Sequence, residues 1–181
     1  MDEVIALDAK RRAAIAEADQ LRALLAEPPE EFRRYAVDLA QRDRLRPWLL
    51  GEAAVAVAAF LAGGLINSMG SHCPWVMPFY GLSILPILYF TLAAVRVARL
   101  KPVVDEIALD GSVLSARRCA AGMLVLGGLW TAADAVFLLY YGSAGQLGRE
   151  LAFLAGGLAI AVAGGLALRQ LKALQPQETP R

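Results

Sequence analysis

The chain has 181 residues, of which 57% are hydrophobic and 19% are charged, and its formal net charge is +1. The apolar share exceeds the about 45–50% of soluble domains, and the near-neutral charge gives no support for nucleic-acid binding. Because the apolar residues are gathered in long runs, we expect one membrane domain in contact with the lipid bilayer and a short soluble arm.

The N-terminal part, residues 1–46, predicts a cytoplasmic arm of two amphipathic helices. Over residues 1–27, one side of the helix repeats at alternating spacings of three and four, as along a coiled-coil seam, although Arg11 interrupts it. The positions of this seam are Val4, Leu7, Arg11, Ala14, Ala18, Leu21 and Leu25. A proline pair then ends this helix. Residues 30–46 predict a second helix whose apolar side and arginines suit a membrane surface, and a solvated arm is the alternative. No signal peptide is expected, because the first long apolar run follows this arm.

Long apolar stretches follow, and they define a transmembrane domain over residues 47–174. The stretches are 48–67, 75–95, 119–141 and 151–168. At about 1.5 Å of rise per residue, each approaches or exceeds the roughly 30 Å of a bilayer core. Pro86 is expected to kink the second stretch. The predicted fold is therefore an all-α, integral membrane four-helix bundle made of two transmembrane hairpins.

The loop at 101–118 is open to two interpretations. Asp110-Gly111 suits the turn of a β-hairpin. Alternatively, Pro102 begins a short helix that ends at this glycine, and Ser112 caps the next helix. An isolated hairpin is only marginally stable, which favours the helix.

Basic residues are distributed unevenly over the loops, which predicts the orientation. Near the membrane, thirteen lysines and arginines lie in the arm, the middle loop and the tail, whereas the two opposite turns hold only Arg149. By the positive-inside rule, both termini are cytoplasmic. The tail, residues 175–181, has the composition of a disordered segment. The alanine-, leucine- and arginine-rich composition suggests the inner (plasma) membrane of a bacterium.

Asp134 is the one charged residue in the third apolar stretch and the main candidate for an intramembrane polar site. A carboxylate at this depth is costly unless it faces protein or water. One interpretation is a proton relay or cation site, and the other is a carboxyl that holds helices together through hydrogen bonds. Its candidate partners, chosen by depth along the helices, are Thr131, Ser83, Tyr80 and Asn67.

Glycines inside the apolar stretches predict close packing of helices, because small residues let another backbone approach. The candidates are Gly63, Gly64, Gly127, Gly128, Gly156, Gly157, Gly164 and Gly165. Such faces suit a homo-oligomer or a subunit of a larger membrane complex.

His72 and Cys73 are adjacent in the turn between the first two stretches, and both residue types bind transition metals. Two ligands do not complete a tetrahedral site, so a second chain would have to supply the others. We therefore predict no metal site and no other cofactor.

The soluble parts contain no nucleophile–base pair, carboxylate dyad or phosphate-binding glycine loop, so we do not expect an enzyme. We expect an interaction or accessory subunit that packs on itself or on a larger membrane complex. The alternative is an ion- or proton-conducting channel or small transporter centred on Asp134. A more distant third interpretation is a redox or metal-handling membrane protein that uses His72 and Cys73.

Overall fold

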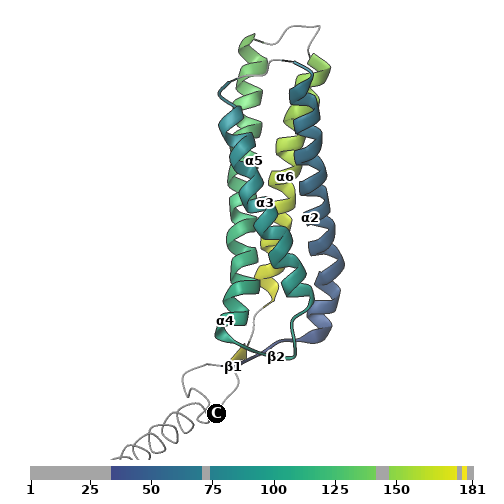
Figure 1. Cartoon of the computed structure of the whole chain (residues 1–181), viewed down its shortest axis with the longest axis vertical. Helices are drawn as coiled ribbons and strands as arrows, with labels where there is room; N and C mark the ends of the chain where they lie inside the picture. Colours follow the sequence, from purple (N-terminus) through teal and green to yellow (C-terminus); the bar gives the residue numbers. More distant parts are fainter. Residues whose placement is uncertain (1–33, 71–73, 142–146, 175–176, 179–181) are drawn as a thin grey trace, which may run out of the picture. The chain divides into compact units, whose positions relative to one another are not determined.

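The computed structural model describes residues 34–70, 74–141, 147–174 and 177–178. They form a bundle of long helices with a small sheet at one end (Figure 1). The long helices are α2 (Leu39–Ser68), α3 (Met77–Ala98), α5 (Ser115–Tyr141) and α6 (Leu147–Ala173). A short helix, α4 (Glu106–Leu109), and a π-helical stretch, η1 (Asp110–Leu114), lead directly into α5. The strands are β1 (Arg34–Ala36), β2 (Val103–Asp105) and β3 (Gln177–Glu178).

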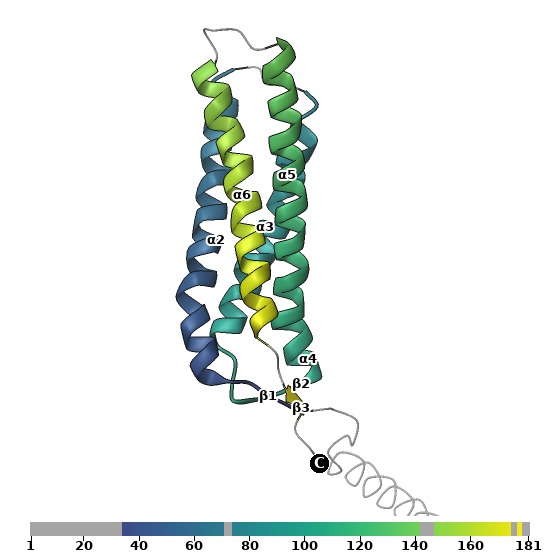
Figure 2. The ribbon, with the colours of Figure 1, turned by 180° about the vertical axis from the view of Figure 1, so that it is seen from behind.

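The helices pack in a ring, in which α2 contacts α3 and α6, and α5 contacts the same two helices. Figure 2 shows α6 beside both α2 and α5, with α3 behind. We call the end of the bundle that carries the strands the sheet end, and the opposite end, where α2 is followed by α3 and α5 by α6, the loop end. The predicted helical bundle is thereby confirmed, with a small sheet added to it.

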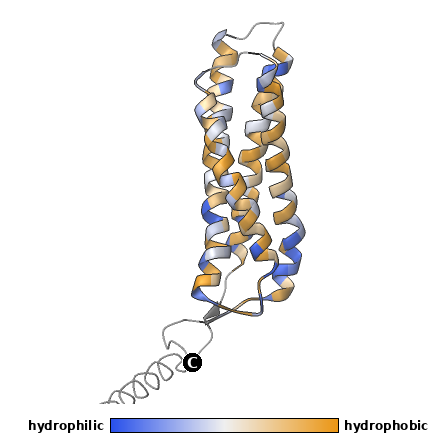
Figure 3. Cartoon of the chain, viewed as in Figure 1, coloured by the Kyte–Doolittle hydropathy of each residue, from blue (hydrophilic) through white to orange (hydrophobic). Residues whose placement is uncertain are grey.

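Among the described residues, four helices are long and apolar enough to cross a membrane. Hydrophobic residues cover most of their length, and strongly hydrophilic ones gather towards the helix ends (Figure 3). Each helix extends beyond its predicted apolar stretch at one or both ends, and α2 begins at a polar cap, well before its apolar stretch. The carboxylate of Asp38 accepts hydrogen bonds from the backbone N–H of Ala40 at 2.9 Å and of Gln41 at 3.3 Å, which starts α2.

The predicted surface helix over residues 30–46 differs from the structure in its described part. Arg34–Ala36 form strand β1, and the residues from Leu39 onward are the first turns of α2, which continues through Pro47. The strand forms because β1 pairs antiparallel with β2 on one side and β3 on the other. The helix predicted over residues 1–27 lies outside the described residues.

The hairpin interpretation of the 101–118 loop is wrong, and the helical interpretation holds in part, because a short helix is present but begins at Glu106 and not at Pro102. Instead of a hairpin at Asp110-Gly111, the chain is helical from Glu106 to Tyr141, and Gly111 does not end the helix. The helix is started by Asp105, whose carboxylate accepts a hydrogen bond from the Ala108 N–H at 2.7 Å. The π-helical turn then carries the backbone through the glycine without a break.

The tail at 175–181 is also not wholly irregular, since Gln177–Glu178 pair with β1 as strand β3. This strand depends on a partner about 140 positions earlier in the chain, which composition alone does not reveal. The rest of the tail lies outside the described residues.

Basic side chains close the helix ends at the sheet end. Arg117 donates to the carbonyl oxygen of Leu171 at 2.6 and 3.1 Å and to that of Leu174 at 2.8 Å. Arg42 donates to the carbonyl of Leu100, just beyond α3. These bonds satisfy carbonyl groups that the last turn of a helix leaves without partners, and they place positive charge at the negative end of each helix dipole.

Candidate functional site

Asp134 lies on the face of α5 that turns towards the other helices. The buried residues of this helix recur every three or four positions, at Ala116, Ala120, Met123, Gly127, Trp130 and Asp134. The Asp134 side chain is 0% exposed. Its carboxyl group therefore sits inside the bundle, in its half nearer the loop end.

The predicted hydroxyl partners of Asp134 donate their protons to backbone carbonyls instead. Thr131 donates to Gly127 at 2.7 Å and Ser83 to Phe79 at 2.6 Å, each within its own helix. Tyr80 donates across to the carbonyl of Phe60 at 3.3 Å. Because a hydroxyl has one proton, none of these three groups donates to Asp134. Asn67 is half-buried near the end of α2.

Below Asp134, towards the sheet end, the bundle is filled by one aromatic ring from each long helix. Tyr80 is the common partner, with its ring centroid 4.6 Å from that of Phe60, 5.1 Å from Trp130 and 5.8 Å from Phe153. The rings of Trp130 and Phe153 lie 4.8 Å apart. We call these residues the aromatic cluster. Phenylalanine, tyrosine and tryptophan bury large areas, so the cluster is a major packing element of the interior.

Several of the predicted packing glycines make room for this cluster. A Cβ atom at Gly63 would lie 2.8 Å from the Trp130 ring, and one at Gly157 also 2.8 Å from it. A Cβ atom at Gly156 would lie 3.3 Å from the same ring, and one at Gly64 2.7 Å from the Tyr80 hydroxyl. The glycines thus admit large rings from neighbouring helices of the same chain.

Two further glycines let the backbones of α5 and α6 approach each other. A Cβ atom at Gly127 would lie 2.6 Å from the backbone nitrogen of Ala161, and one at Gly164 would lie 2.6 Å from the Ala120 carbonyl oxygen. Gly165 faces only Leu124 at 3.7 Å, and Gly128 has nothing within 4 Å. Most of the predicted glycine faces are therefore occupied inside this chain and are not free for a second copy.

A second buried acid lies nearer the sheet end, between α2 and α6. Glu52 is 7% exposed, and its Oε1 accepts a hydrogen bond from Nε2 of Gln170 at 2.8 Å. Its partner is 118 positions away, and helical spacing along α2 alone could not identify it.

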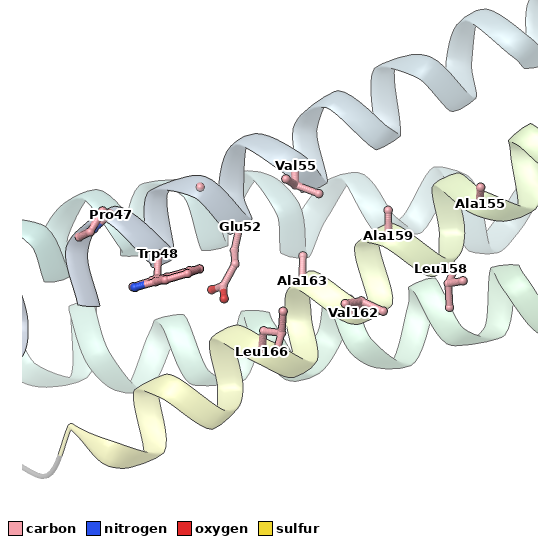
Figure 4. A pocket seen from close by; sticks show the side chains of 11 residues that line it. Pro47, Trp48, Glu52, Val55, Ala155, Leu158, Ala159, Val162, Ala163 and Leu166 are labelled. Carbon is pink, nitrogen blue, oxygen red and sulfur yellow. The ribbon is translucent and has the colours of Figure 1, made fainter. Parts of the chain in front are cut away.

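Glu52 lines an apolar crevice of about 800 Å³ between the two helices (Figure 4). The figure shows its carboxylate pointing from α2 towards α6, beside the indole of Trp48. The other residues of the lining are Pro47, Gly51, Val55, Ala155, Leu158, Ala159, Val162, Ala163 and Leu166.

Glu150, near the start of α6, is a buried acid that the sequence analysis missed, and its side chain is 1% exposed. A signal was present, because Glu150 continues the buried stripe of Phe153, Gly157 and Ile160 at the same spacings. The neighbouring Arg149 donates from Nη1 to the Met69 carbonyl oxygen at 3.0 Å. This bond ties the start of α6 to the end of α2.

Within the described ranges, no group of three or more histidine, cysteine or acidic residues is placed to hold a metal ion. The candidate ligands His72 and Cys73 lie outside those ranges. The comparisons with other proteins add no functional assignment: no family model, curated protein or solved structure matches this chain.

Proposed function

We propose that this protein is an accessory or interaction subunit of a bacterial inner membrane, with both termini in the cytoplasm. In this role the bundle anchors the N-terminal arm, and the arm binds a second copy of the chain or another subunit of a membrane complex. The protein has no catalytic role in this proposal.

The observation that carries the proposal is the attachment of the arm to the bundle. Strand β1 (Arg34–Ala36) lies within the predicted arm and is the central strand of the sheet β2-β1-β3. The backbone N–H of Val37 also donates to the Pro102 carbonyl oxygen at 2.9 Å. The root of the arm is therefore held by the segment between α3 and α4 and by the chain after α6. Such a fixed root suits a segment that must reach a partner at a defined place.

The tightly packed interior of the bundle also supports an anchoring role for the protein rather than an ion-conducting role. In the order of residues along α2 and α5, the aromatic cluster lies between Glu52 and Asp134. Trp130 and Phe153 are both 0% exposed, so this level of the bundle is packed with rings. A path for ions between the two acids would require these rings to move apart.

The test is the size of the full chain, purified in mild detergent and measured by light scattering, together with any co-purified subunit. We expect a complex larger than one chain. The double substitution Leu7→Asp and Leu21→Asp, which places charge in the predicted seam, should dissociate it. The matched control carries the same charges off the seam, as Ala9→Asp and Ala23→Asp, and should leave it intact. A monomeric wild type, or a seam variant that associates like the wild type, contradicts the proposal.

A proton- or cation-conducting role is the second candidate, and the observation that favours it is the burial of both Asp134 and Glu150. Both acids lie in the half of the bundle nearer the loop end and have at most 1% exposure. Ionisable groups in the interior of a membrane bundle often mark an ion or proton path. A flux assay on the same protein, described in the Discussion, separates this role from anchoring.

A further inference from the structure

The crevice between α2 and α6 is apolar except at one end, where Glu52 is the one ionisable residue of the lining. Pro47, Trp48 and the buried Glu52 lie nearer the sheet end, and the lining from Val55 and Ala155 is apolar. A tryptophan is typical of the membrane–water interface. The side of α6 that lines the crevice runs from Ala155 to Leu166, about 16 Å at 1.5 Å per residue. This length matches one leaflet of a hydrocarbon core about 30 Å thick.

At the polar end of the crevice, a buried hydrogen-bond acceptor lacks a donor among the described residues. Glu52 is more than nine-tenths buried, and within the part of the chain that the structure describes, no donor reaches its Oε2. Gln170, which donates to the other oxygen of Glu52, is not among the residues that line the crevice. No described lysine or arginine forms an ion pair with Glu52. A buried acceptor without a donor is unfavourable by about 1–3 kcal/mol, so this end of the crevice suits a group that only donates.

An ammonium group has the complementary chemistry, because it carries a positive charge and three N–H donors and has no acceptor. We propose that the crevice binds one phospholipid with a primary ammonium headgroup. The ammonium lies at Glu52, near the sheet end, and an acyl chain runs along Leu166, Val162 and Leu158. The volume of about 800 Å³ is within the roughly 300–1,000 Å³ of small-molecule sites.

The dimensions favour a lipid over a helix of a partner protein. A helix with its side chains is about 10 Å wide and crosses both leaflets. The crevice is lined over the length of one leaflet and has its polar end at one side only. This inference does not depend on the proposed role of the N-terminal arm.

The test compares two phospholipids with the same acyl chains on the full chain in detergent, with bound lipid counted by native mass spectrometry. Phosphatidylethanolamine carries a primary ammonium, whereas the quaternary ammonium of phosphatidylcholine has no N–H to donate. We expect the ethanolamine lipid to bind roughly tenfold more tightly, as one charge-assisted hydrogen bond would give. Equal binding of the two lipids by the wild type overturns the proposal.

Glu52→Gln tests the headgroup site, because it removes the charge and replaces an acceptor with a donor. We expect this variant to bind the two lipids equally. The control is Glu106→Gln, which neutralises an exposed acid near the sheet end and should keep the preference. If Glu52→Gln keeps the tenfold preference, the carboxylate does not recognise the headgroup and the proposal fails.

Ala159→Phe tests the acyl-chain site, because the new ring fills the crevice. We expect it to lose both lipids, with helix content and thermal stability like the wild type. The control is Ala132→Phe, in a separate apolar groove between α3 and α5, which should bind lipid normally. If Ala159→Phe binds both lipids normally, the crevice is not the lipid site. If it instead loses a co-purified membrane subunit while lipid binding is unchanged, the occupant is a partner helix and the proposal is wrong.

Discussion

The ring of Trp130 in α5 meets the ring of Tyr80 in α3 almost at right angles, with an interplanar angle of 83° and 5.1 Å between the centroids. This edge-to-face arrangement is one of the preferred geometries for aromatic pairs. It lies at the centre of the aromatic cluster, and Phe153 from α6 touches both rings. The cluster joins all four long helices at one level.

Removal of the central ring should therefore weaken the whole bundle. We expect Trp130→Ala to lower the free energy of unfolding in detergent by about 3–5 kcal/mol, because it leaves a large cavity. Trp75→Ala is the control, since that side chain is 78% exposed and should cost little. Equal stability of the two variants, measured by thermal or denaturant unfolding, would show that the cluster is not a main support of the fold.

Adjacent glycines in α5 offer a matched test of the close approach to α6. Gly127→Ala places a Cβ 2.6 Å from the Ala161 backbone nitrogen, so the helices must separate. We expect a destabilisation of about 1–3 kcal/mol, as in an overpacked core. Gly128→Ala meets nothing within 4 Å and should be neutral or stabilising by up to about 1 kcal/mol, because alanine favours helix. If an unfolding assay finds Gly128→Ala less stable than Gly127→Ala, the close approach of α5 and α6 at Gly127 is contradicted.

Arg117 and Arg118 allow the capping of α6 to be separated from simple charge. Arg117→Ala removes three hydrogen bonds to carbonyl groups at the end of α6, and we expect a loss of about 1–3 kcal/mol in stability. Arg118→Ala removes the same charge from a side chain that is 73% exposed and 3.4 Å from Asp110. An exposed ion pair contributes little, so this control should stay within about 1 kcal/mol of the wild type. Equal losses of stability in the two variants would mean that the positive charge, and not the capping of α6, stabilises the bundle here.

The two proposed functions predict different effects for two substitutions of Asp134, one to asparagine and one to leucine. If the carboxyl only supports packing, Asp134→Asn should assemble and function like the wild type, because an amide also donates and accepts. Asp134→Leu should then weaken the bundle by about 0.6–2 kcal/mol, the range for intramembrane hydrogen bonds. If the residue conducts protons or cations, asparagine should abolish flux into liposomes while stability stays normal. Under the anchoring proposal we expect no flux even from the wild type, and a gradient-driven flux lost in Asp134→Asn would establish conduction.

The orientation is tested by thiol labelling of intact cells in a Cys73→Ser background. Ala144→Cys, in the loop between α5 and α6, should react with a membrane-impermeant reagent from outside. Lys101→Cys, in the segment between α3 and α4, should react only after the cells are opened. Labelling in the opposite order would place the sheet end outside the cytoplasm.

The long helices were predictable from sequence because hydropathy is a local property of each stretch. Their true beginnings at Leu39 and Glu106 depend on capping by Asp38 and Asp105, signals that the apolar pattern hides. The sheet was not predictable in the same way. It joins Tyr35 to Val104 and Glu178, so its short strands are stabilised only by distant partners.

The same distinction applies to the candidate sites. The glycine pattern predicted close packing, but not that Trp130 would occupy the space beside Gly63 and Gly157. Glu52 was visible as an acid in an apolar stretch, whereas its partner Gln170 and the crevice follow only from the packing of α2 on α6. The sequence showed which residue types could form a site, but not which distant residues would contact them.

The capping by Arg42 and Arg117 has a consequence for the biogenesis of the protein. Both belong to the group of basic residues that predicts orientation, and both are bound to backbone carbonyls in the folded bundle. In the proposed orientation, both are free cations during insertion and keep this end of the helices on the cytoplasmic side. After folding, the same charges close α3 and α6. A chain inserted the wrong way round would have to move these arginines across the membrane before any carbonyl could accept their hydrogen bonds. In this proposal, the same side chains therefore set the orientation first and cap the helices afterwards.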